Sequence, residues 1–134
     1  MPLSLRYGIV CEDIRREDNG KLILIGVFAR DIGISNFPAS LVLALCVSME
    51  VDEPGDFEIE FQFLFRDEIS IQGKTSITIN DPGLGMIVIP RFPIENITGE
   101  GGISFRFRQA GSEWQTVASL PIVSRASTTC PPPS

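Results

Sequence analysis

The chain of 134 residues contains no histidine, and it has only one tryptophan, one tyrosine and two lysines. Without histidine, neither a Ser-His-Asp nor a Cys-His nucleophile can form, and zinc and most copper or non-haem iron sites lose their usual ligand. A Ser-Lys pair would have to use Lys21 or Lys74, and neither lies in a recognisable motif. Gly83-Leu84-Gly85 lacks the further glycine and the helix of a phosphate-binding loop. We therefore expect a protein that is not an enzyme.

Long apolar runs, an excess of basic residues and closely spaced cysteines are also absent. The longest apolar runs, near residues 22–29 and 41–47, are far shorter than the roughly 20 residues of a membrane helix, and no signal peptide is visible. A net charge of −6 argues against nucleic acid or a membrane surface as partner. Cys11, Cys46 and Cys130 form no C-x-x-C pair, as expected for free thiols in a reducing compartment. We expect a cytoplasmic protein.

What the chain does contain is the alternation typical of β-strands. Residues 57–66, with the sequence FEIEFQFLFR, carry Phe or Ile at every odd position, and residues 103–108 repeat the pattern. A period of two gives a strand one apolar and one polar face. Asp18-Asn19-Gly20 predicts a hairpin turn, because Asn and Gly accept positive φ angles.

This pattern predicts an all-β domain over residues 1–123, an antiparallel two-sheet sandwich of immunoglobulin-like or C2-like type. A flexible tail rich in Pro, Ser and Thr is expected over residues 124–134. About eight strands are expected, over residues 5–17, 21–30, 41–51, 57–66, 74–79, 86–90, 103–108 and 114–123.

Acidic residues gather in the expected turns. If successive loops alternate between the two ends of a sandwich, four acidic turns lie at the same end. Clustered carboxylates can bind Ca²⁺, which takes six to eight oxygen ligands, so this end is a candidate cation-dependent ligand site. The alternative is that Asp and Asn serve only local hydrogen bonds in turns. The candidate ligands are Asp18, Asp52, Asp56 and Asp81; no other cofactor is expected.

A second acidic pattern, Glu58 and Glu60, lies within the expected strand 57–66. Residues two apart point to the same side at about 6.5–7 Å, a separation that glycoside hydrolysis could use. A solvated sheet face explains the same pattern, with Arg66, Arg106 and Arg108 as cross-strand partners. We favour the solvated face, because a sugar cleft would also need exposed aromatic platforms.

Three expected strands have apolar residues at both odd and even positions, although a strand in a two-sheet fold needs only one apolar face. The second face must therefore be covered. Residues 32–38 or 91–97 of the same chain could cover it, or another chain could, which predicts a protein partner or self-association. Ile25→Glu should unfold the monomer if this side is core, and dissociate an assembly if it is an interface. The segments are residues 22–29, 41–49 and 86–89.

The stretch Cys11-Glu12-Asp13-Ile14-Arg15, followed by Gly20-Lys21-Leu22 and Leu24-Ile25-Gly26-Val27-Phe28, resembles the opening of a family of small bacterial proteins of unknown function. The resemblance lies mainly in residues 11–28, and it implies a single β-sandwich in a bacterial or prophage setting, with no catalytic residue. With the strand pattern, it favours a non-enzymatic binding or assembly module with a protein partner. A Ca²⁺-dependent ligand-binding domain is the alternative.

Overall fold

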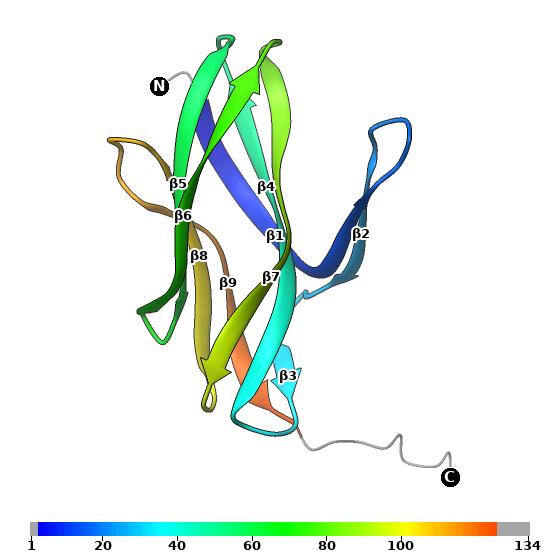
Figure 1. Ribbon diagram of the computed structural model, residues 1–134, viewed down its shortest axis with the longest axis vertical. Coiled ribbons are helices and arrows are strands. Elements are labelled where there is room, and N and C mark those ends of the chain that lie inside the picture. Colours follow the sequence, from blue (N-terminus) through cyan, green and yellow to red (C-terminus); the bar gives the residue numbers. More distant parts are fainter. Residues whose placement is uncertain (1–2, 126–134) are drawn as a thin grey trace.

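The computed structural model describes residues 3–125, which form nine β-strands in two sheets (Figure 1). No helix occurs within this range, so the expected all-β class is confirmed. The strand order is β2-β1-β4-β7 in the four-stranded sheet and β3-β9-β8-β5-β6 in the five-stranded sheet. The strands are β1 (Leu3–Arg16), β2 (Leu22–Val27), β3 (Ile32–Ile34), β4 (Ala39–Val51), β5 (Gly55–Phe65), β6 (Glu68–Ile79), β7 (Gly83–Ile97), β8 (Gly101–Gln109) and β9 (Gln115–Ser124).

One strand pair departs from the expected antiparallel arrangement. β3 lies between the expected strands 21–30 and 41–51, where no strand is predicted, and it pairs with β9 in parallel, with Ile32 opposite Ile122. Ile32 and Ile34 are both buried, so this strand does alternate. Three residues are too short for a period of two to be recognised in the sequence.

Strands β6 and β7 are longer than predicted. β6 starts at Glu68 because Arg66 and Asp67, both with positive φ, connect β5 to β6 in a two-residue turn. Such turns favour Asn and Gly, so an Arg-Asp turn carries no sequence signal. β7 continues to Ile97 through Pro90 and Pro93, which an edge strand tolerates because one row of its N–H groups has no partner strand.

The main core lies between the two sheets and contains the phenylalanine ladder of β5. Phe57, Ile59 and Phe63 are buried, as the alternation predicts. The ring of Phe63 meets Phe92 of the opposite sheet at 4.7 Å between centroids and Phe105 of its own sheet at 5.0 Å. These contacts join β5, β7 and β8 in one cluster of buried side chains.

The second half of β1 no longer pairs with β4. Leu3–Cys11 pair with β4, whereas Cys11–Arg16 pair only with β2, and the β1–β2 hairpin projects from the rest of the molecule in Figure 1. We call residues 12–27 the arm. Its turn lies where it was predicted, with Gly20 at φ 86°, but Asn19 does not have the expected positive φ. The side chain of Asn19 instead accepts the N–H of Lys21.

The described chain ends just after β9. The guanidinium of Arg125 donates two hydrogen bonds to Asp31, at 2.8 and 2.7 Å, and its backbone N–H donates to the carbonyl of Ile34. The remainder of the predicted tail, including Cys130, lies outside the described residues.

Candidate functional site

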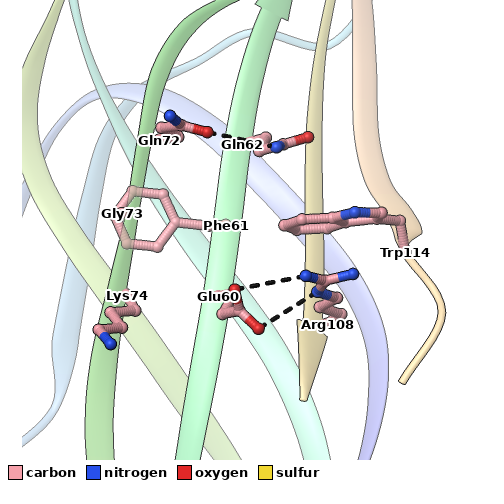
Figure 2. A pocket seen from close by; sticks show the side chains of 8 residues that line it. All are labelled: Glu60, Phe61, Gln62, Gln72, Gly73, Lys74, Arg108 and Trp114. Atoms are coloured by element: carbon pink, nitrogen blue, oxygen red, sulfur yellow. Dashed lines mark hydrogen bonds and ion pairs between the residues drawn. The ribbon is translucent and has the colours of Figure 1, made fainter. Parts of the chain in front are cut away.

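The outer face of the five-stranded sheet has a shallow depression of about 380 Å³, lined by side chains of β5, β6 and β8 and by Trp114 (Figure 2). Glu60 and Arg108 form an ion pair across it at 3.3 Å, and Lys74 pairs with Glu58 at 3.5 Å. Arg108 is therefore the cross-strand partner that was expected for this face. Arg66 contacts the carbonyl of Glu100 instead.

The indole of Trp114 contacts two arginine side chains of β8 on this face. The guanidinium carbons of Arg106 and Arg108 are 5.2 and 4.3 Å from its ring centroid, within the range of a cation–π interaction. Arg106 Nε also donates to Gln62 Oε1 at 2.7 Å, and Gln62 donates to Gln72 at 3.4 Å. Charges and amides on this face thus find partners within the chain, as on a solvated sheet face.

The four-stranded sheet is different, because it exposes apolar side chains. Among the described residues, eight large apolar side chains are exposed, and seven of them belong to β1, β2, β4 and β7. The eighth, Ile69, lies on β6. We call these seven the apolar surface: Tyr7, Ile23, Ile25, Val27, Val42, Leu84 and Met86.

A groove of about 520 Å³ lies where the arm meets β4 and the end of β7. Its apolar lining includes Ile25 and Val42 of the apolar surface, and its charged lining includes Asp13, Arg15 and Arg91. A centre of exposed aliphatic side chains with charges around it has the composition of a protein-binding surface.

Beneath the arm, the floor of the sheet is made of small side chains. Ala44 and Cys46 are fully buried and pack with Cys11 and Ile14, so the arm of the same chain covers this part of β4. Residues 32–38 and 91–97, which were one of the two alternatives for this cover, instead contain β3 and the end of β7. The second face of β4 is therefore covered within the monomer at Ala44 and Cys46, whereas Val42 of β4 and Ile23, Ile25 and Val27 of β2 stay exposed.

Cys11 and Cys46 are free thiols in this floor, as predicted. The Sγ of Cys46 lies 3.1 Å from the Sδ of Met86. Burial raises the pKa of both thiols above the ordinary 9.0, and for Cys11 the neighbouring Cys46 raises the pKa further. Both thiols are therefore protonated at neutral pH, which suits packing and not nucleophilic chemistry.

Three of the four candidate Ca²⁺ ligands lie in three different turns, and the fourth lies in a strand. Asp52 and Asp81 lie in the β4–β5 and β6–β7 turns, which share one end of the molecule (Figure 1). Asp56 is the second residue of β5 and accepts a hydrogen bond from Thr78 at 2.7 Å, whereas Asp18 lies at the tip of the arm. In residues 3–125, no three His, Cys, Asp or Glu side chains form a group that could hold a metal ion. Calcium binding stays a prediction.

Residues 6–85 match a protein family described as a family of unknown function (DUF6941). The match starts in β1, contains the whole arm and β4, and ends in β7, so it extends well beyond residues 11–28. No match is found among curated proteins. The described part of the chain also has no helix that could cross a membrane.

Proposed function

The chain belongs to the DUF6941 family of unknown function, and we propose that it is a non-enzymatic protein-binding and assembly module. Its working surface is the apolar surface, formed by the arm and the outer side of the four-stranded sheet. Single exposed apolar residues are normal on soluble proteins. Seven on one sheet, against one on the other, form a concentration that supports a protein partner.

Exposure also decides how the substitution Ile25→Glu should act. Ile25 is 39% exposed, so a carboxylate there remains in water and should not unfold the monomer. It should instead weaken any complex that buries this side chain. Ile69→Glu on β6 is the matched control, since Ile69 is 49% exposed and lies on the other sheet.

The test compares wild type, Ile25→Glu and Ile69→Glu in two measurements, light scattering for self-association and affinity capture for other proteins. We expect all three to share one denaturation midpoint. Self-association or a captured protein should persist with Ile69→Glu and be lost with Ile25→Glu. Identical behaviour of all three proteins in both measurements would contradict the proposal.

The alternative function, a Ca²⁺-dependent ligand-binding domain, is supported by the shared end of the Asp52 and Asp81 turns. A thermal melt of EDTA-treated protein with and without millimolar Ca²⁺ tests it. A ligand present at about 100 times its Kd adds roughly 2.7 kcal/mol of stability, which should raise the midpoint by several degrees. An unchanged midpoint would remove this alternative.

The proposal also includes the finer fold type, a sandwich of immunoglobulin-like or C2-like form. One cluster of buried side chains drawn from strands of both sheets supports it. A cytoplasmic location is proposed from the free cysteines, and a bacterial or prophage origin from the resemblance of residues 11–28.

A further inference from the structure

Each sheet has two edge strands, and three of the four edges carry features that hinder pairing with another strand. β7 contains Pro90 and Pro93, β6 carries Glu68 and Lys74, and β3 is only three residues long. Charges, prolines and shortness are the usual means of protecting an edge. The fourth edge, β2, has the sequence LILIGV with neither charge nor proline.

The hydrogen bonds of the arm show which backbone groups of β2 lack a partner strand. The N–H of Glu17 donates to the carbonyl of Lys21 at 2.8 Å, so this pair is hydrogen-bonded. Hydrogen-bonded pairs alternate along an antiparallel ladder, so Ile23 and Ile25 also turn their backbone groups to β1. Leu22 and Leu24 consequently turn theirs to the free edge, because β1 is the only neighbour of β2 in the described residues.

We propose that β2 pairs antiparallel with β2 of a second copy of this chain, so that the two arms join their four-stranded sheets. This inference rests on the proposed function and names its partner. The edge is complementary to itself, since two copies related by a two-fold axis present the same outward N–H and C=O groups to each other. The side chains that meet are aliphatic on both copies, with no like charges opposed.

The kink at Gly26 selects the register. Gly26 has φ 67°, so its backbone is not extended and the usable edge is residues 22–25. An axis between the two copies of Ile23 places Leu22 of each copy opposite Leu24 of the other. Both outward residues then exchange their N–H and C=O groups, which gives four hydrogen bonds between the chains. An axis at Leu24 would oppose Leu22 to the kinked Gly26.

The first experiment removes one outward N–H. Leu24→Pro deletes it without deleting a bond to β1, and Leu24→Ala is the control, because it shortens the same side chain and keeps the N–H. We expect a concentration-dependent dimer for wild type and Leu24→Ala by analytical ultracentrifugation, and a monomer for Leu24→Pro. Circular dichroism checks that all three retain the native strand signal.

A second experiment reads the register and leaves the Leu24 side chain in place. Ile23 would lie opposite its own copy in a non-hydrogen-bonded pair, where Cα atoms are about 4.5 Å apart, within the range of a disulfide. In a Cys130→Ser background, oxidised glutathione accepts two electrons and two protons as Ile23→Cys forms the intermolecular disulfide. Ile25→Cys is the control, because it faces Lys21 of the second copy and should not cross-link to itself.

The outcomes separate this inference from the proposed function. A wild type that stays monomeric at its highest soluble concentration overturns the β2 pairing, while protein capture that is sensitive to Ile25→Glu would leave the proposed function standing. A dimer that is lost with Leu24→Pro but survives Ile25→Glu supports strand pairing, because Ile25 then faces Lys21 of the second copy, and contradicts binding through the exposed face. A dimer that survives Leu24→Pro but not Ile25→Glu overturns strand pairing in favour of face packing. A dimer insensitive to both overturns inference and function together.

Discussion

The outer faces of the two sheets differ in how their side chains are covered or paired. On the five-stranded sheet, polar side chains contact each other across the strands, as in the Glu60–Arg108 pair beside Trp114 (Figure 2). On the four-stranded sheet, the arm covers Ala44 and Cys46 and leaves its own aliphatic side chains in water. One face is complete within the monomer. The other face exposes apolar side chains both on the arm and on the rest of the sheet, such as Leu84 and Met86, where a partner can bury them.

Side-chain size explains why only one sheet has a covering arm. The outward positions of β4 in its buried stretch include Ala44 and Cys46, which are small enough for Ile14 to pack on them. The corresponding positions of β5 carry Glu58, Glu60 and Gln62, whose long polar side chains need water or a polar partner. An arm could not lie on that face without burying charges.

The largest expected effect comes from placing a charge on each face in turn. Ala44→Glu puts a carboxylate at a position with 0% exposure and no cation near it in the cluster. An uncompensated buried charge should lower the free energy of unfolding by about 3–5 kcal/mol. Gln72→Glu, on the exposed face beside Lys74 (Figure 2), should change it by less than about 0.5 kcal/mol.

Chemical denaturation of both variants measures this difference. Equal losses for the two would mean that the arm does not exclude water from β4, and the contrast between the faces would fail. A large loss for Ala44→Glu with an unchanged wild-type strand signal would show that covering by the arm contributes to the stability of the whole domain.

A smaller effect is expected at the kink of the arm. Gly26 has φ 67°, and a Cβ there would lie 2.7 Å from Cδ of Glu12. Gly26→Ala should therefore cost about 1–3 kcal/mol, the sum of a left-handed backbone and a displaced Glu12. Gly20→Ala, with φ 86° and no atom within 4 Å of its Cβ, should cost only the backbone part, about 1 kcal/mol.

A double variant separates the two contributions at the kink. Combining Gly26→Ala with Glu12→Ala removes the clash, so its extra cost over Glu12→Ala alone should fall to that of Gly20→Ala. Denaturation midpoints of the four proteins measure this. An undiminished cost in the double variant would show that the backbone at Gly26 alone shapes the arm.

The local sequence pattern predicted burial correctly where a strand has water on one face and the core on the other. The Phe57-to-Phe65 alternation gave the correct buried positions for Phe57, Ile59 and Phe63. The position of the turn at Asn19-Gly20 was also predicted correctly, because Gly20 has the expected positive φ, although Asn19 does not. In both cases the physical cause lies within a few neighbouring residues.

The pattern did not predict features that depend on distant residues. β3 exists because β9 accepts it in parallel, and the cover of Ala44 comes from Ile14, thirty positions earlier. Apolar residues at both parities indicated that β4 is covered on two sides, but a period cannot say which segment covers it. The arm, as the candidate site, was visible only as an unexplained excess of apolar residues in β2.

The smallest expected effect concerns the ion pairs of the five-stranded sheet. Glu60 and Arg108 have side chains that are each 31% exposed, so a double-mutant cycle with Glu60→Gln and Arg108→Gln should give a coupling of about 0.2–1 kcal/mol. Salt should reduce it, since dissolved ions screen the interaction between exposed charges. The Lys74–Glu58 pair is 71% and 50% exposed, and its coupling should be weaker still.

These couplings are the strictest test of the contrast between the two faces. If the charges on the five-stranded sheet are paired within the chain and exposed to water, either ion pair can be removed with little loss of stability and no change in self-association. A coupling well above 1 kcal/mol, or a change of oligomeric state in Glu60→Gln, would mean that this face also contributes to an interface. The division of the molecule into a solvated sheet and a binding sheet would then be wrong.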